Sequence, residues 1–243
     1  MRVVVLSASF LAACGFAPGA SGTQPDPQPD PAGPDASVDV RTCHATQPDV
    51  RLCLDFEDTA LVPVIGDMSS GRHDAAAVLV DTMPRATQHA ALVTASSSIT
   101  VPETADLDLA QNLTIEMWLR PSVTGTNPSP LANTGQYALA IQDDQVACTF
   151  GTHTAVSDQQ LEVGKWAHVA CSYDGTTVRV YVDGELDACK TAAGTIANTN
   201  GSGTVIAAGY AGGIDDIHVY ARTLDPTQIQ ALAGVTSDKI TCP

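Results

Sequence analysis

The sequence predicts an all-β fold, a two-sheet antiparallel sandwich with one short helix near the C-terminus. Apolar and polar residues alternate with a period of two in several segments after residue 50. Residues typical of tight turns separate these segments, and no long stretch has the period of a helix. Many short strands with almost no helix favour two packed sheets, because each sheet must bury one face against another element.

The clearest strand is residues 113–120, in which Leu113, Ile115, Met117 and Leu119 share one face while polar residues occupy the other. Along the chain the strands are expected at residues 52–57, 76–80, 90–94, 97–101, 113–120, 137–141, 146–150, 167–173, 178–183 and 217–220.

Turn residues separate the later strands. We expect turns at residues 142–145, 173–177 and 183–185, where Gly175 and Gly184 supply the positive φ that tight hairpins require. The one predicted helix covers residues 226–232. Asp225 is its expected N-cap and Pro226 its first helical residue.

The first 41 residues do not have a globular composition. The apolar run 3–13 follows Arg2 and would form only about 16 Å of helix, too short for a hydrocarbon layer of about 30 Å. We therefore predict a signal peptide at residues 1–13, a tether at 14–41 and a folded domain at 42–243. In residues 24–31 every second residue is proline, which prevents a helix or a strand ladder and extends the chain.

The sequence Leu11-Ala12-Ala13-Cys14 resembles the lipobox of bacterial lipoproteins. The resemblance implies that Cys14 is acylated and becomes the mature N-terminus, anchoring the chain in a membrane. Gly15 at the next position favours the outer membrane or cell surface of a Gram-negative bacterium. An ordinary cleaved signal peptide with an incidental cysteine is the alternative.

The charge of the chain limits its partners. Lys and Arg number 11 against 27 Asp and Glu, a formal net charge of −16. This balance disfavours nucleic acid and anionic lipid surfaces, since both are bound through clustered Lys and Arg. It suits an extracellular setting or divalent cations.

Seven cysteines leave six for disulfides if Cys14 carries lipid. No C-x-x-C pair is present, so an oxidising compartment is favoured over a zinc site. We favour a bridge between Cys148 and Cys171, on successive strands that would be neighbours in one sheet. The pairing of the others stays open between two alternatives, namely Cys43–Cys53 with Cys189–Cys242, or a Cys43–Cys242 bridge.

Several motifs in order resemble a known family. They are residues 54–58, 113–121, 166–175, 180–184 and 213–220, and together they are similar to the laminin G-like jelly-roll domain of the concanavalin A-like lectin/glucanase fold. The resemblance covers residues 50–233. It implies a binding module for carbohydrate or extracellular protein; a structural envelope lipoprotein without a ligand is one alternative, and a glycan hydrolase is another.

No enzyme is predicted. The paired carboxylates of glucanases with this fold follow E-x-D-x-E patterns, which this chain lacks, and G-x-S-x-G and H-E-x-x-H motifs are missing too. Trp118 and Trp166 are interpreted as sandwich packing rather than sugar platforms. His168 and His218 are interpreted as packed or exposed neutral histidines.

A structural calcium ion is the one predicted cofactor. Related sandwiches often hold calcium where the first and last strands meet, and here those strands supply Glu57, Asp58 and Asp215. Carboxylate oxygens are the ligands that calcium prefers. The alternative is that Glu57 and Asp58 are exposed while Asp215 caps a turn.

Overall fold

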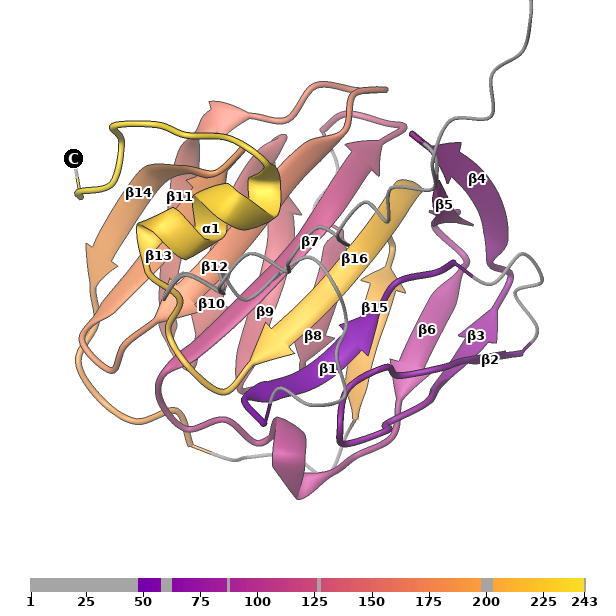
Figure 1. Ribbon diagram of the computed structural model, residues 1–243, viewed down its shortest axis with the longest axis horizontal. Coiled ribbons are helices and arrows are strands. Elements are labelled where there is room, and N and C mark those ends of the chain that lie inside the picture. The colour runs from indigo at the N-terminus through magenta and orange to yellow at the C-terminus, as the bar shows by residue number, and fades with distance from the viewer. Residues whose placement is uncertain (1–47, 58–62, 87, 126–127, 198–202, 243) are drawn as a thin grey trace, which may run out of the picture. The chain divides into compact units, whose positions relative to one another are not determined.

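The computed structural model describes residues 48–57, 63–86, 88–125, 128–197 and 203–242. These residues form two antiparallel sheets and one α-helix (Figure 1). Their elements are β1 Val50–Leu54, β2 Val64–Ile65, β3 Ala75–Val78, β4 Asp81–Arg85, β5 Gln88–Val93, β6 Ser98–Val101, the 3-10 turn η1 Ala105–Leu107, β7 Leu113–Pro121, β8 Ser129–Asn133, β9 Tyr137–Gln142, β10 Gln145–Phe150, β11 His153–Gln160, β12 Ala167–Tyr173, β13 Thr177–Val182, β14 Glu185–Thr191, β15 Thr204–Ala208, β16 Gly212–Tyr220 and α1 Pro226–Ala233.

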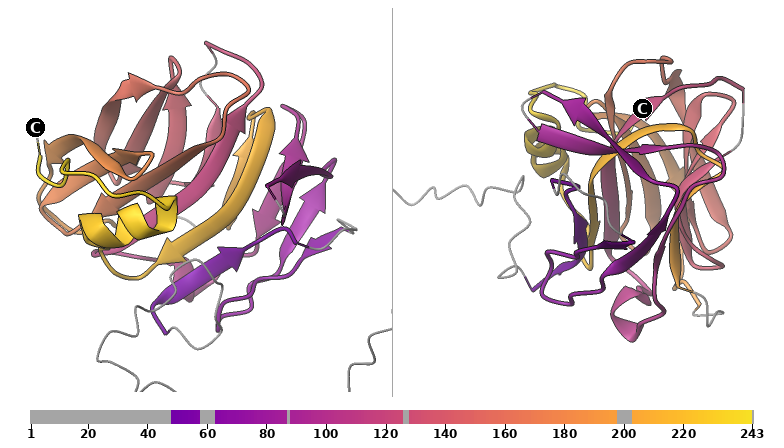
Figure 2. Two further views of the ribbon diagram at one scale, coloured as in Figure 1. Left: turned by 45° about the horizontal axis from the view of Figure 1, so that its top comes forward. Right: turned by 90° about the vertical axis from the view of Figure 1, so that its right-hand side faces the viewer.

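The sheets stack face to face as the predicted sandwich (Figure 2). The first has the order β14-β13-β12-β7-β16-β5-β4, with β1 also paired to β16. The second has the order β11-β10-β9-β8-β15-β6-β3-β2. We call them the helix-side sheet and the far sheet, because α1 lies on the outer face of the first.

Strand alternation fills the space between the sheets. Ile115, Met117 and Leu119 of β7 are fully buried in the main core, where they meet side chains of the far sheet such as Leu139 and Phe150. Burying each such side chain contributes about 1.5–3 kcal/mol. The same alternation turns Glu116 and Trp118 toward the outer face of the helix-side sheet.

A smaller apolar cluster lies on that outer face. Ile229 and Leu232 of α1 pack against Ala170, Tyr181 and Tyr220 of the sheet. The helix begins where the sequence predicts, with Asp225 as N-cap and Pro226 first, and it ends at Gly234 in the left-handed conformation. Among the described residues, no helix is long and apolar enough to span a membrane.

The strands missing from the sequence prediction lack its clear alternation. They are β2, β4, β8, β11, β14 and β15. Pro84 lies inside β4, which the structure tolerates because β4 is the edge strand of its sheet. Two of the predicted turns are tight hairpins: Asp143 and Asp144 join β9 to β10 with positive φ, and Asp183 and Gly184 join β13 to β14.

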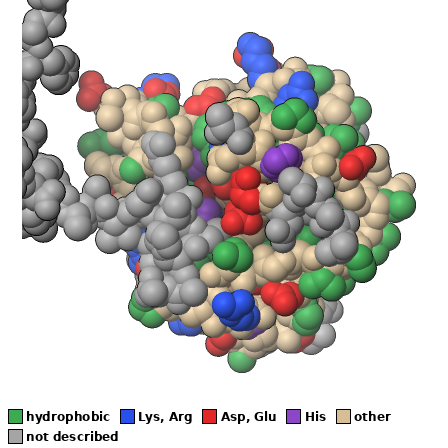
Figure 3. Space-filling model, turned by 45° about the vertical axis from the view of Figure 1, so that its right-hand side comes forward, with side chains coloured by type: hydrophobic (Ala, Val, Ile, Leu, Met, Phe, Trp, Pro, Cys, Tyr) green, Lys and Arg blue, Asp and Glu red, His purple; other side chains and the backbone are tan. Residues whose placement is uncertain are grey.

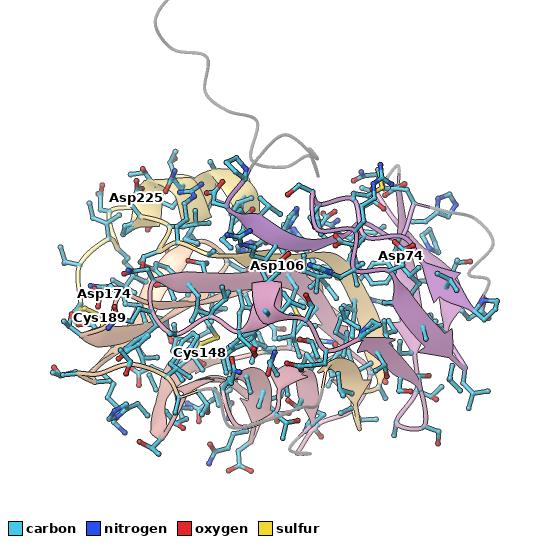
Figure 4. The ribbon with its side chains drawn as sticks, turned by 90° about the horizontal axis from the view of Figure 1, so that it is seen from below. Asp74, Asp106, Cys148, Asp174, Cys189 and Asp225 are labelled. Atoms are coloured by element: carbon cyan, nitrogen blue, oxygen red, sulfur yellow. A yellow bond between two sulfur atoms is a disulfide. The ribbon has the colours of Figure 1, made fainter. Side chains whose placement is uncertain are left out.

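The structure joins Cys148 to Cys171, the pair favoured from the sequence. Their strands are not neighbours in one sheet, however. Cys148 lies in β10 of the far sheet and Cys171 in β12 of the helix-side sheet, so the bridge crosses the core rather than joining neighbours (Figure 4). The expectation that their strands share a sheet is therefore wrong.

A second bridge links β14 to the C-terminal tail. Cys189 pairs with Cys242, which removes the Cys43–Cys242 alternative. Cys53 is disulfide-bonded as well. Cys43, which the sequence offers as its partner, and Cys14 lie outside the described residues.

Candidate functional site

A pocket of about 280 Å³ opens on the outer face of the helix-side sheet. Its floor is formed by Glu116 and Trp118 of β7 with Asp216 and His218 of β16. Arg85 and Gln88, at the facing ends of β4 and β5, form one wall, and residues 232–234 at the C-terminal end of α1 form the other. Figure 3 shows acidic side chains gathered beside histidines on one face of the molecule.

Glu116 is held between two imidazoles on the floor of this pocket. β7 is central, so His168 reaches Glu116 from β12 on one side and His218 from β16 on the other. Glu116 Oε2 lies 2.9 Å from His168 Nε2, and Oε1 contacts His218 Nδ1. All three side chains are at least 97% buried, with exposed fractions of 2%, 0% and 3% for Glu116, His168 and His218.

This pairing decides the ionisation of the cluster. Burial alone would raise the pKa of Glu116, but the positive field and hydrogen bonds of His218 and His168 outweigh it and lower the pKa to about 2. Burial opposes a charge on His218, yet the Glu116 carboxylate raises the pKa of His218 above its usual 6.5. Both shifts favour a carboxylate–imidazolium pair in this buried cluster.

Arg85 forms a second ionic group beside the first. Its Nη1 atom lies 2.5 Å from Asp215 Oδ2 and 2.8 Å from Asp216 Oδ2. The guanidinium carbon lies 4.4 Å from the ring centre of Trp118 and 5.6 Å from that of Trp166. Arg85 is therefore bound by two carboxylates and packed between two indoles.

A local irregularity of β16 makes this arrangement possible. Consecutive residues of a regular strand point to opposite faces, but the register of β16 with β7 shifts between Asp215 and His218, and Asp216 has a φ of 47°. Both Asp215 and Asp216 therefore reach Arg85. Burial and the charge of Asp216 raise the pKa of Asp215 to about 7, against the opposing effect of Arg85.

The predicted packing role of Trp118 and Trp166 describes only part of their position. Both are partly exposed on the outer face of the sheet, and Trp118 lines the pocket. Trp166 lies against Gly213 of β16, where an added Cβ would come within 2.5 Å of its ring. Arg85 faces both indoles, so their packing also positions the guanidinium.

The structure does not bring the predicted calcium ligands together around a free space. Both oxygens of Asp215 are engaged, Oδ2 by Arg85 and Oδ1 by the N–H of Asp216. Glu57 Oε2 faces His89 instead, accepting from its backbone N–H at 3.4 Å. Asp58 lies outside the described residues, and within the described ranges no group of three His, Cys, Asp or Glu side chains is arranged to hold a metal.

Sequence reasoning missed Arg85 and Glu116. Glu116 carried a signal, since it is an acidic residue at a central position of a strongly apolar strand. Arg85 carried none, because its partners Asp215 and Asp216 are 130 and 131 residues away in the sequence. Its strand also lacks a clear alternation.

A second pocket of about 220 Å³ lies where the β10–β11 hairpin meets residues 193–197. Phe150 and Tyr173 line it as a stacked pair, and the Tyr173 hydroxyl donates to the Gly194 carbonyl. Its walls carry few ionisable groups, and His153 is the one histidine among its described lining residues. The first pocket has the denser set of charged groups.

Solved structures share this fold. Domain 4 of the arabinanase AbnA from Geobacillus stearothermophilus, in complex with arabinotriose, superposes with a TM-score of 0.64 at 17% identity, covering 76% of this chain and 98% of that one. The binding domain of Paraclostridial Mosquitocidal Protein 1 superposes with a TM-score of 0.65 at 15% identity, covering 76% of this chain and 52% of that one. A structure of botulinum neurotoxin type C, whose cell entry is described as dependent upon interaction with two ganglioside molecules, gives a TM-score of 0.61 at 14% identity, covering 76% of this chain and 51% of that one.

The chain thus spans about half the length of the toxin structures, and at these identities the likeness establishes the fold. No curated protein matches the chain. The family model of laminin G-type domains matches residues 93–230, which is more than half of the 243 residues. The chain therefore belongs to this family of the concanavalin A-like lectin/glucanases superfamily.

Proposed function

We propose that the chain is a lipid-anchored binding module, displayed at the outer membrane or cell surface, with carbohydrate as its ligand. The observation that carries the proposal is the pocket on the outer face of the helix-side sheet. It places carboxylates, an amide and an indole within one concave surface. Such a mixture suits a sugar, which presents hydroxyl groups and C–H faces together.

The structural neighbours support carbohydrate over other ligands. One is described in complex with arabinotriose, and another is a neurotoxin whose cell entry is described as dependent on gangliosides. An extracellular protein is the other ligand class that the fold supports, since a third neighbour is a neurotoxin binding domain in complex with synaptotagmin II. Fold alone does not select among these ligands, so the weight of the proposal rests on the pocket.

A glycan array probed with the detergent-solubilised full-length chain tests the proposal. We expect a small set of related glycans to bind, in the presence and absence of calcium. If no glycan binds but an extracellular-protein array captures the chain, the ligand is a protein rather than a carbohydrate. If both arrays are blank, the chain is a structural envelope protein.

We propose no catalytic role. Glu116 is held by two buried histidines and Asp215 by Arg85, so both carboxyl groups are engaged in the folded protein. A release assay on mixed polysaccharides is expected to yield no soluble sugar. Release that is lost in Glu116→Gln would contradict this part of the proposal.

Structural calcium stays a prediction that now depends on Glu57 and Asp58. An ion bound only to the native state raises the melting temperature, and the rise increases with the logarithm of its concentration once the site is saturated. We expect a higher melting temperature in calcium than in chelator, with the difference lost in Glu57→Gln. Superimposed melting curves would contradict it.

A further inference from the structure

The cations that line the pocket are already bound by the protein. Arg85 Nη1 is shared by Asp215 and Asp216, and its guanidinium is packed over Trp118. His218 forms an ion pair with Glu116. Within the described part of the chain, no lining Lys or Arg other than Arg85 is present, so an anionic ligand would have to compete with carboxylates for its counter-charge.

The groups that face the cavity are mainly acceptors. Asp216 uses Oδ2 for Arg85, its side chain is 22% exposed, and its Oδ1 has no protein partner among the described residues. Glu116 also lines the cavity, but its carboxylate is buried and is paired with His218 and His168. Gln88 is the one lining amide, and it supplies both a donor and an acceptor.

The end of α1 adds negative potential to the same cavity. The helix presents its C-terminal residues 232–234 as a wall, and its last turn contains no basic residue. The N–H groups there are used, since Gly234 donates to Ala231 and Val235 to Gln230. The negative end of the helix dipole therefore lies at the pocket without a compensating cation from the helix, and it favours positive charge.

We propose that this pocket selects sugars that bring hydrogen-bond donors and no negative charge, with a free amine as the preferred group, and that it rejects uronic acids. The inference rests on the proposed function and names the substrate class of the same site. An ammonium group would donate to Asp216 Oδ1, the carboxylate oxygen that the protein leaves to a ligand. A uronate would face those same oxygens without a free cation to pair with.

Three oligosaccharides of matched length test this selectivity: a chitosan hexamer with free amines, a chitin hexamer with acetylated amines, and a hexagalacturonate. Binding is measured by calorimetry with the detergent-solubilised full-length chain at pH 7, in low and in high salt. We expect the amine ligand to bind most tightly, the acetylated ligand more weakly and the uronate not measurably. Added salt should lower the affinity for the amine ligand but not for the acetylated ligand, because only the binding of the amine depends on charge.

The Asp216→Asn variant tests whether this pocket is the site that prefers the amine ligand. This variant removes one partly buried negative charge, so the preference for the amine over the acetylated ligand should fall about fivefold, which corresponds to about 1 kcal/mol. Asp158→Asn, an exposed acid on β11 of the far sheet, is the matched control and should keep the wild-type preference.

The outcomes separate this inference from the proposed function. Uronate binding as tight as the amine, an acetylated ligand tighter than the amine, or a preference unchanged in Asp216→Asn would overturn the selectivity while leaving a carbohydrate-binding module. If none of the three sugars binds and the glycan array is blank, the proposed function itself fails.

Discussion

Glu116 shows how one strand position combines packing with charge. Its neighbours along β7, Ile115 and Met117, are buried in the main core, while Glu116 faces the other side and lies between His168 and His218. A charged pair at this depth is costly unless its members are hydrogen-bonded to one another. The two histidines meet that requirement for the carboxylate.

The cluster predicts a definite pH dependence of folding. Because the pKa of Glu116 falls from 4.5 to about 2 on folding, its stabilising contribution is complete above pH 4.5 and is lost as the pH falls toward 2. Because folding raises the pKa of His218 above 6.5, its contribution is complete below pH 6.5 and is lost as the pH rises through that higher pKa. The pair therefore stabilises the fold most between pH 4.5 and 6.5.

Urea unfolding of wild type and His218→Gln across pH 3 to 9 measures this effect. The variant should lose about 3–5 kcal/mol at pH 5.5, since it leaves Glu116 without its imidazolium partner. It should also lose the wild-type decline of stability above pH 6.5. His153→Gln, on β11, is the control, and equal pH profiles for His218→Gln and wild type would contradict the account.

The sequence predicts the local structure around individual residues but not the contacts between residues that are far apart in the chain. The sequence predicts that Trp118 and Trp166 pack in the sandwich, but it does not predict their common partner Arg85. The bulge that turns Asp215 and Asp216 to the same guanidinium depends on one backbone conformation at Asp216. Neither the bulge nor a contact across 130 residues has a local sequence signal.

The helix α1 is the element whose position depends most clearly on local sequence. Asp225 Oδ1 accepts from the backbone N–H of Thr227 at 2.9 Å and of Gln228 at 3.0 Å, while Gln228 Oε1 accepts from the N–H of Asp225. This capping box satisfies N–H groups that have no partner inside the helix. It also explains why the helix start was predictable.

Asp225→Ala should destabilise the protein by about 1 kcal/mol, because two backbone N–H groups lose their acceptor. Chemical unfolding at pH 7 measures the loss. Asp225→Ser retains a capping oxygen and should recover most of the stability. An alanine variant as stable as wild type would show that packing of Ile229 and Leu232 alone holds the helix.

The strands that could be predicted from the sequence are those in which apolar and polar residues alternate clearly. β7, β12 and β13 combine a buried inner face with a patterned sequence, and they were expected close to their observed bounds. β4 was missed because its sequence contains Pro84, and β15 because residues 204–208 are nearly all apolar or small. In both cases pairing with neighbouring strands decides the structure, and this pairing is not local.

Across the whole molecule, the order of strands in the sequence does not show which sheet each strand joins, as the Cys148–Cys171 disulfide illustrates. Cys148 and Cys171 were paired from the closeness of their strands in the sequence, but the structure separates those strands into facing sheets. The bridge therefore ties the two layers through the core. A sandwich places consecutive strands in either sheet, so proximity in sequence predicted the partner but not the geometry.

The predicted lipid anchor, Cys14, lies outside the described residues. The proposal expects Cys14 to carry acyl chains, so Cys14→Ser should move the protein from the membrane fraction to the soluble fraction. Cell fractionation followed by immunoblotting measures the distribution. Membrane association that persists in Cys14→Ser after a high-salt wash would contradict lipid anchoring at this residue.

If the pocket beside Arg85 binds the sugar, filling that pocket with a large side chain should weaken binding. Gln88 is exposed at the pocket wall, so Gln88→Trp should fill the cavity without disturbing the core. Calorimetry with the tightest array ligand should show at least a tenfold loss of affinity, about 1.4 kcal/mol, in Gln88→Trp. Gln159→Trp, at an exposed position of the far sheet, should bind like wild type. Equal affinities in wild type and a folded Gln88→Trp would contradict the account.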